Sequence, residues 1–167
     1  NKNTISYLIE AIPKKSIKVA DSQVASRWGN ITDFKKFDLI TPNEKEARFS
    51  IGDQDSNIGS LASSLIKIAK CNFLILKLGD KGVLFNVNSK KFFFIDSFVK
   101  NNIDPVGAGD ALLAYASLSY VLTKSKSQAA IIGSIASACE CEKEGNIPVK
   151  PNDLKEIINE YKNLLKI

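Results

Sequence analysis

A run of four apolar residues, Phe73 to Leu76, restricts the fold more than any other feature of the sequence. A strand with one face in water alternates apolar and polar residues, whereas a strand covered on both faces is apolar throughout. An amphipathic helix is predicted just before this run, over residues 60–70. Strands and helices alternate from residue 17 to residue 76. This order predicts an α/β fold with a mostly parallel sheet and helices on both faces.

The remaining elements complete this pattern. Further strands are predicted at residues 17–20, 37–40, 83–87 and 91–95, the last two forming a β-hairpin. Further helices are predicted at residues 5–12, 44–49, 107–122, 128–142 and 153–165. The apolar stretch from Ala111 to Leu122 is interpreted as a buried core helix, and Gly145 as the residue that stops the helix at 128–142. We find no repeat or linker, so residues 1–167 are interpreted as a single domain.

The composition excludes several kinds of site. Hydrophobic residues make up 44% and charged residues 25% of the 167 residues, an ordinary globular balance. Histidine is absent, which removes Ser-His-Asp and Cys-His catalysis and every His-ligated metal site. The three cysteines argue against a disulfide framework, and Cys139 and Cys141 are expected to be buried thiols. Chemistry therefore falls to carboxylates, lysines and backbone amides.

Charge and hydropathy bear on partners and compartment. The net charge of +5 is modest, and the lysines are spread along the chain instead of clustering as in a nucleic-acid binder. A mildly basic protein that binds anionic phosphates is the simpler interpretation. No signal peptide or membrane-spanning run is recognised, so we expect a cytoplasmic protein with no membrane or nucleic-acid partner.

The segment IDPVGAGDAL, residues 103–112, carries the clearest chemical pattern. Gly107 and Gly109 stand just before a predicted helix, where missing side chains let a ligand approach the backbone. The first amides of a helix lack internal partners, so Gly107, Ala108, Gly109 and Asp110 are predicted to present N–H groups to an anion. A carboxylate at Asp110 would repel that anion unless it takes a proton from an attacking hydroxyl. The pattern therefore favours phosphoryl transfer with Asp110 as general base.

A simpler interpretation stays open at this point. The glycines can merely form a tight turn, and Asp110 can merely stabilise the positive end of the helix dipole. No Walker A pattern supports a phosphate site elsewhere in the sequence. A Rossmann dehydrogenase is excluded because its glycine fingerprint follows the first strand, whereas these glycines follow a hairpin late in the chain.

DPVGAGD resembles the signature of the ribokinase, or pfkB, carbohydrate kinases. Three more segments resemble the same family in the same order: TPNEKEA at 41–47, KLGDKGVLF at 77–85 and EKEGNIPVKPNDL at 142–154. The resemblance runs from Val19 to the end of the chain. It implies a three-layer, Rossmann-like α/β fold of the ribokinase type, whose N-terminal part is absent from this chain.

The resemblance also implies functional residues. Asp110 corresponds to the catalytic base, and Gly107, Ala108 and Gly109 form the anion hole. The implied nucleotide-binding residues are Lys77, Gly79, Asp80, Gly82, Asn43, Cys139 and Asn146. The implied metal-binding residues are Glu46, Asn43 through a water, and Asp104. ATP and magnesium are the implied cofactors, with potassium as a further cation.

Several of these residues also have a purely structural interpretation. Asn43 and Glu46 form a helix capping box by spacing alone. Asp104 can simply cap its loop, and Lys77 stands where many relatives carry threonine. Two other features are read the same way: Gly79 and Gly82 as a plain turn, and Phe92 to Phe94 as packing residues of a strand.

The family's kinases are about twice this long, which affects what the chain can do. The absent half of the fold supplies most sugar contacts, the lid and strands of the sheet. We therefore expect an exposed sheet edge and apolar surface, and either a fragment of a larger polypeptide or a homo-oligomer. We expect the chain alone to bind ADP or ATP with magnesium and to turn over sugar poorly.

The substrate is open between several classes. Asp21, Gln23, Thr32, Asp33 and Phe34 resemble the heptose-phosphate kinase domain of ADP-heptose synthases, although Gln23 replaces an expected lysine. Another sugar or sugar phosphate is the broader alternative. A kinase of a vitamin or nucleoside hydroxyl on the same fold is a further one. A non-catalytic nucleotide-binding module ranks lower, because Asp110 and both glycines are intact.

Overall fold

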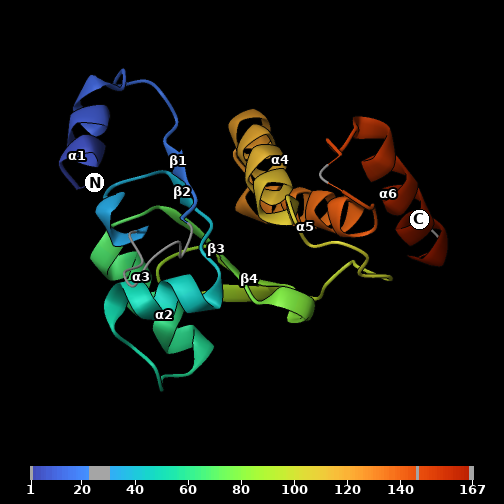
Figure 1. Cartoon of the computed structure of the whole chain (residues 1–167), viewed down its shortest axis with the longest axis horizontal. Helices are drawn as coiled ribbons and strands as arrows, with labels where there is room; N and C mark the ends of the chain where they lie inside the picture. The colour runs from blue at the N-terminus through green and yellow to red at the C-terminus, as the bar shows by residue number, and fades with distance from the viewer. Residues whose placement is uncertain (1, 23–30, 146, 166–167) are drawn as a thin grey trace. The chain divides into compact units, whose positions relative to one another are not determined.

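The computed structural model describes residues 2–22, 31–145 and 147–165 (Figure 1). Its helices are α1 (Lys2–Ala11), α2 (Glu44–Ile51), α3 (Ile58–Ala69), α4 (Ala108–Thr123), α5 (Lys126–Cys141) and α6 (Pro151–Leu165), with short 3-10 turns at Ile31–Asp33 and Gly79–Lys81. Its strands are β1 (Val19–Ala20), β2 (Leu39–Ile40), β3 (Phe73–Lys77), β4 (Val83–Asn86) and β5 (Phe92–Ile95). The predicted order of elements is thus confirmed.

The chain divides into two compact units. The first comprises Asn1–Leu78 with Leu84–Phe93, and the second comprises Gly79–Val83 with Phe94–Ile167. Figure 1 shows α1, α2 and α3 in the first unit, and the yellow-to-red helices α4, α5 and α6 in the second.

The strands form one five-stranded sheet in the order β1-β2-β3-β4-β5. β1 pairs with β2 in parallel, Val19 opposite Leu39, and β2 pairs with β3 in parallel, Leu39 opposite Phe73. The connection from β3 to β4 is too short for a parallel crossover, so these strands run antiparallel. β4 and β5 form the predicted hairpin, closed by a bond from the Val87 amide to the Lys91 carbonyl. The sheet is therefore mixed and mostly parallel on the side of β1 to β3.

β3 is buried on both faces, as its continuous apolar sequence predicts. Residues 73–76 are each fully buried. Leu74 and Leu76 belong to the core cluster that includes Leu61 and Leu65 of α3. Successive side chains of a strand point to opposite faces, so the equally buried Phe73 and Ile75 lie on the other side. The central strand is thus held by apolar burial from two directions, which stabilises it by about 1.5–3 kcal/mol per large side chain.

β1 and β2 are shorter than predicted because a side chain replaces part of the ladder. Oδ2 of Asp38 accepts a hydrogen bond from the Lys18 amide at 2.8 Å. The Lys18 carbonyl in turn accepts from the amides of Asp38 and Leu39. Regular pairing therefore begins only at Val19 and Leu39.

The helices of the second unit pack closely at one glycine. α4 packs on α5, and a Cβ added to Gly133 of α5 would lie 2.9 Å from Cβ of Ala116 and 3.0 Å from the carbonyl oxygen of Leu112 in α4. Gly133 therefore allows a helix separation that no larger residue permits.

Two expectations for these helices are wrong. α4 is not buried all round: it buries one stripe that includes Leu112, Ala116 and Tyr120, while Leu118 is 62% and Leu122 is 82% exposed. Four-residue spacing puts the buried residues on one side, so apolar composition alone does not imply full burial. None of the described helices is both long enough and apolar enough to cross a membrane. α5 ends at Cys141 with Glu142 as its C-cap, so Gly145 lies beyond the helix instead of stopping it.

The aromatic strand also differs from expectation. Phe93 and Phe94 are 44% and 48% exposed. Phe92 is partly buried and packs against the first unit's core. Phe93 stacks on Phe85 with ring centroids 6.0 Å apart, and the Lys91 ammonium lies 4.9 Å from the Phe93 ring. β5 stands at one end of the strand order, and this edge position leaves its aromatic residues without full cover among the described residues.

The contact at Gly133 gives a stability test. Gly133→Ala is expected to lower the free energy of unfolding by about 1–3 kcal/mol, because the new methyl group meets Ala116 and the α4 backbone. Gly59→Ala in α3 meets only the Asn57 side chain at 3.4 Å and should be neutral or stabilising by up to about 1 kcal/mol. Chemical denaturation of both variants would measure the difference. A stabilising Gly133→Ala would contradict the close packing of α4 and α5.

Candidate functional site

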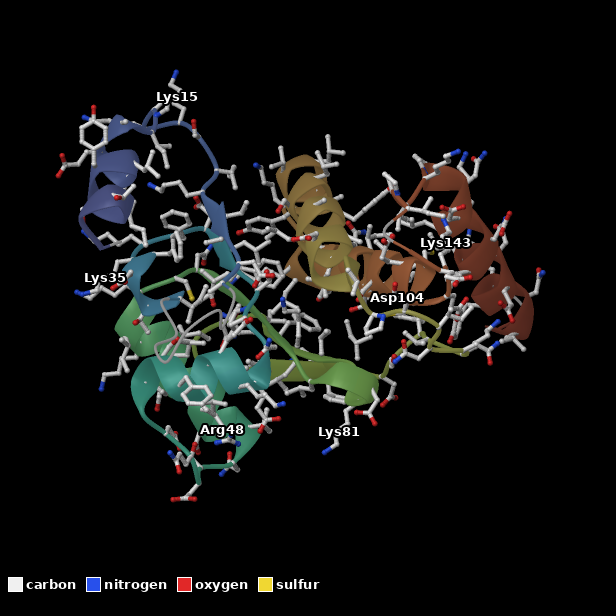
Figure 2. The ribbon with its side chains drawn as sticks, in the orientation of Figure 1. Lys15, Lys35, Arg48, Lys81, Asp104 and Lys143 are labelled. Carbon is white, nitrogen blue, oxygen red and sulfur yellow. The ribbon has the colours of Figure 1, made fainter. Side chains whose placement is uncertain are left out.

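The loop before α4 is ordered by its own side chain. Oδ1 of Asp104 accepts a hydrogen bond from the Val106 amide at 3.0 Å, and the intervening residue is Pro105. This bond closes a turn that directs the chain into α4. Figure 2 labels Asp104 in this loop of the second unit. Asp104 therefore caps its loop, as the structural interpretation of this residue predicts. A role for Asp104 in binding a cation stays a prediction.

A carbonyl at the end of α5 anchors the same loop. The Cys141 carbonyl accepts two hydrogen bonds, from the Ile103 amide at 2.8 Å and from the Asp104 amide at 3.1 Å. The last carbonyls of a helix have no partner within the helix. The loop therefore satisfies the end of α5 and is itself held in place.

Gly107 makes the sharp entry into α4. It is the N-cap residue and has φ +87°, a left-handed conformation that residues with a Cβ rarely adopt. The Ala111 amide donates to the Gly107 carbonyl at 2.9 Å, which is the first bond of the helix. The Ala108 amide donates to the Pro105 carbonyl at 3.3 Å. The expectation that Ala108 offers its N–H to an anion is thus wrong in this conformation, because the turn uses it.

The remaining amides fit the predicted anion site. Within the described residues, the amides of Gly107, Gly109 and Asp110 have no hydrogen-bond acceptor. They stand at the positive end of a 16-residue helix that has no side-chain cap. Asp110 is exposed, and its carboxylate makes no hydrogen bond or ion pair with the described residues. This arrangement can bind an anion and leaves a carboxylate free to accept a proton.

Asn43 and Glu46 of the first unit form the predicted capping box at the start of α2. Oδ1 of Asn43 accepts from the Glu46 amide at 2.9 Å, and Oε2 of Glu46 accepts from the Asn43 amide at 2.8 Å. Glu46 is only 4% exposed. Burial raises the pKa of the Glu46 carboxyl, opposed by the Asn43 hydrogen bond and the charge of Lys77, while the charge of Asp21 adds to the rise. The cap uses one carboxylate oxygen and leaves Oε1 for another partner.

An ion pair lies beside this capping box. Nζ of Lys77 lies 2.6 Å from Oδ2 of Asp21, and both side chains are 18% exposed. The Lys77 amide donates to the Pro42 carbonyl at 2.9 Å, and Lys77 forms a parallel β-bridge with Asn43. Paired residues in a parallel ladder place their side chains on the same face. The carboxyl ends of β1, β2 and β3 therefore bring Asp21, Glu46 and Lys77 into one charged group.

These residues fit a magnesium ion that arrives with a nucleotide. Magnesium is commonly held by one or two carboxylates together with substrate phosphates and water. Glu46 supplies one buried carboxylate with a spare oxygen, and the Asn43 side chain lies beside it. No group of three or more His, Cys, Asp or Glu that could hold a metal on its own occurs among the described residues. The oxygen donors therefore suit a shared metal better than a protein-only cage.

In the turn between β3 and β4, Gly82 occupies a position that has no room for a side chain. Gly82 has φ +98°, and a Cβ there would lie 2.1 Å from the carbonyl oxygen of Ile95. Gly79 has φ +64° but open space around it, and Asp80 is exposed. Gly82 thus has a structural role, whereas Gly79 and Asp80 leave room for a ligand. Nucleotide binding by this turn stays a prediction.

The segment between α5 and α6 is held by an ion pair in the second unit. Nζ of Lys143 lies 2.5 Å from Oδ2 of Asp153, which also accepts from the Lys150 amide at 2.8 Å. The Tyr115 hydroxyl donates to the Val149 carbonyl at 2.8 Å. Figure 2 labels Lys143 at the start of this segment. Asn146, predicted to bind nucleotide, lies outside the described residues, as does Gln23.

Cys139 and Cys141 are buried thiols, as expected. Cys139 is 5% exposed and packs in a cluster with Ile135 and Leu154. Burial raises the pKa of its thiol to about 11. The thiol is therefore a packing group in this structure, and no observation supports the predicted contact with nucleotide.

Asp21 is the charged residue of this region to which sequence reasoning gave no chemical role. Its signals in the sequence are its share in the heptose-phosphate kinase likeness and its position, directly after β1 at the carboxyl end of the parallel strands. Ligands of open α/β sheets bind at that end. The partner, Lys77, is 56 residues away in the sequence, and no local pattern connects the two.

The chain is similar to known proteins over most of its length. Residues 3–153 match the family described as pfkB family carbohydrate kinase. The bifunctional protein HldE of Geobacter metallireducens is 25% identical over 134 residues, covering 78% of this chain and 27% of that protein. HldE of Campylobacter curvus is also 25% identical, over 82% of this chain and 30% of its own length.

Solved structures share the fold. A ribokinase from Thermotoga maritima matches with a TM-score of 0.76 at 24% identity, over 92% of this chain and 52% of its own. Phosphofructokinase-2 from Escherichia coli, in a complex with potassium, matches with a TM-score of 0.80 at 19% identity, over 96% and 52%. The fold is therefore ribokinase-like, as predicted. The chain spans about half the length of these structures and less than a third of the curated relatives.

Measurements of folding stability can distinguish a capping role of Glu46 from a role that needs its negative charge, such as metal binding. Glu46→Gln is expected to change the free energy of unfolding by less than about 0.5 kcal/mol, because glutamine can accept the same bond from Asn43 and its burial costs less. Asn43→Ala should cost about 1 kcal/mol, because it removes the cap. Urea denaturation measures both. Equal losses would indicate that the structure itself needs the negative charge.

The Lys143–Asp153 pair predicts a pH dependence. The hydrogen bond from Lys143 lowers the pKa of Asp153 below its ordinary value. The carboxylate therefore stabilises the fold above its unfolded pKa of about 3.9, and this contribution is lost as pH falls through the lower folded pKa. Asp153→Asn should lower stability at pH 7 and flatten the acid limb of the stability profile. Glu156→Gln, an exposed change in the same helix, should leave that limb unchanged, and a loss there as large as in Asp153→Asn would refute the assignment.

Proposed function

Because the chain belongs to the pfkB family of carbohydrate kinases, we propose that it is the nucleotide-binding and catalytic part of an ATP-dependent sugar kinase. The observation that carries this proposal is the start of α4. In one helical turn there, the amides of Gly109 and Asp110 and the exposed Asp110 carboxylate have no partner among the described residues. An anion site beside an unpaired carboxylate is what phosphoryl transfer to a hydroxyl requires.

In the proposed reaction, Asp110 is the general base. The sugar hydroxyl oxygen attacks the γ-phosphorus of ATP, its proton passes to the Asp110 carboxylate, and the bond to the bridging oxygen of ADP breaks. The amides of Gly107, Gly109 and Asp110 stabilise the negative charge on the transferring phosphoryl group. Gly107 holds these amides in position through its left-handed conformation. The chain therefore contributes positioning and charge stabilisation, which supply most of the catalysis of phosphoryl transfer.

Magnesium is the cation that the first unit would hold with the nucleotide. Glu46 would bind it through the oxygen that the cap leaves free, and Asn43 would act through a water. The ion would neutralise phosphate charge. Asp104 remains a candidate for a second cation, and potassium is named with phosphofructokinase-2. These assignments rest on donor chemistry and on the family resemblance.

A heptose phosphate is the finer substrate hypothesis. The HldE relatives and the likeness around Asp21, Thr32 and Asp33 support it. Another sugar of this family is the alternative, since 25% identity does not define a substrate and Gln23 departs from the HldE-like pattern. A panel of sugars, sugar phosphates, nucleosides and vitamins with a complete protein would separate the classes.

We infer that the chain needs further polypeptide for full activity. It spans about half the length of the solved structures, and α4 exposes Leu118 and Leu122. A second copy of the chain or additional sequence of the same protein would supply the cover and sugar contacts. The odd cysteine count and the buried thiols support a reducing, cytoplasmic environment for this protein.

The first test is calorimetric titration of ADP or ATP, with magnesium, into this chain and two variants. The chain should bind nucleotide. Asp110→Asn should keep that binding within about threefold, because it removes only the base, and Gly109→Val should abolish it by blocking the approach to the open amides. In a complete kinase, Asp110→Asn should lower kcat by at least about a hundredfold.

Thermal unfolding checks that both variants fold. Gly109→Val binding as well as the parent would refute the anion site at α4. Nucleotide binding lost in Asp110→Asn but kept in Gly109→Val would assign Asp110 to binding instead of proton transfer.

A further inference from the structure

The Asp21 carboxylate is held on both of its oxygens. Oδ1 accepts a hydrogen bond from the Ser22 amide at 2.9 Å, and Oδ2 accepts from Nζ of Lys77 at 2.6 Å. Ser22 is 6% exposed, so the backbone donor is itself fixed in the interior. The carboxylate therefore has one orientation, and it defines where the Lys77 ammonium lies.

The ion pair spans the end of the strand between its two members. β2 lies between β1 and β3, and neighbouring strands are about 4.8 Å apart. Asp21 follows β1 and Lys77 ends β3, so the two backbones are separated by about two strand spacings. The Lys77 side chain must cross the carboxyl end of β2, next to Asn43, to reach Asp21. Its ammonium thus lies over the point where the chain enters α2.

Among the described residues, this group has two carboxylates, Asp21 and Glu46, and one ammonium, that of Lys77. A lysine nitrogen has three protons, and the Asp21 bond accounts for one of them. Among the described residues Nζ has no second acceptor, so the ammonium keeps donors for a further anionic ligand, and the Lys77 side chain is partly exposed. An ion pair of this kind is weak as a purely stabilising device, since desolvation offsets most of its Coulomb energy.

We propose that Asp21 is a positioning residue for nucleotide binding, which holds the Lys77 ammonium across the end of β2 so that Lys77 donates to a nucleotide phosphate. The inference rests on the proposed function and adds a role to a residue that the family signature does not assign. Asp21 acts through Lys77 and does not itself touch the ligand. A lysine without this partner would sample many rotamers, and binding would have to order it.

The effect of Asp21→Asn on ADP affinity distinguishes positioning of Lys77 from an effect of net charge, because the two predict changes of opposite sign. Removing a negative charge near a phosphate site should tighten anion binding if only net charge matters. Asp21→Asn should instead weaken ADP binding, because the ammonium loses its fixed place. The measurement is made with ADP in EDTA, so that no divalent metal contributes and any direct role of Asp21 as a metal ligand is silent.

The experiment is a double-mutant cycle on the whole 167-residue chain. We expect Lys77→Met to weaken ADP binding by about tenfold and Asp21→Asn by about threefold to fivefold. In the Lys77→Met background, Asp21→Asn should have less than a twofold further effect, because its route through Lys77 is gone. Lys77→Arg should restore part of the affinity in the presence of Asp21 and less in its absence.

Asp38→Asn is the matched control. Asp38 is another half-buried aspartate of the first unit, and its carboxylate accepts from the Lys18 amide before β1, at the opposite end of the strands. The same loss of charge there should leave ADP affinity within twofold, although it can lower the melting temperature. Melting curves of all variants separate folding from binding.

Two results overturn the proposal without touching the proposed function. One is unchanged or tighter ADP binding by Asp21→Asn. The other is an equal loss from Asp21→Asn in the parent and Lys77→Met backgrounds, which would assign Asp21 an independent role. If the unsubstituted chain binds neither ADP in EDTA nor magnesium–ADP, the proposed function fails and this inference fails with it.

Discussion

The parallel register of β1, β2 and β3 is the constraint on which the first unit's site depends. The hydrogen bonds continue past the regular strands, from the Thr41 amide to the Ala20 carbonyl at 3.0 Å and from the Lys77 amide to the Pro42 carbonyl at 2.9 Å. A slip of one residue would turn every side chain of a strand to the other face. The charged residues meet only because this register holds, and apolar burial of β3 on both faces maintains it.

Features that depend on residues close together in the sequence were predictable. The unbroken apolar run of β3 predicted a strand with both faces covered. The three-residue spacing of Asn43 and Glu46 predicted a capping box, and both of its bonds are present. Gly107 and Gly109 predicted a sharp helix entry, and Gly107, the N-cap of α4, makes it with a positive φ. In each case the controlling interaction lies within a few residues, so the sequence pattern and the physical cause coincide.

Features that depend on the tertiary arrangement were not predictable. The Asp21–Lys77 pair joins residues 56 apart, and it exists only once β1 and β3 are placed in one sheet. The use of the Ala108 amide by Pro105 depends on the detailed turn. The exposed face of α4, at Leu118 and Leu122, differs from prediction because composition reports how apolar a helix is and not what covers it.

The shared carbonyl of Cys141 has a mechanical consequence. One acceptor at the end of α5 holds the amides of both Ile103 and Asp104, and the Asp104 side chain in turn holds the amide of Val106. These bonds form a continuous chain of contacts from the last turn of α5 to Val106, the residue before Gly107. A small rotation of that turn would tilt the amides at the start of α4. The end of α5 and the start of α4 are thus coupled through this loop, so that an anion bound by the α4 amides would also restrict the position of the last turn of α5.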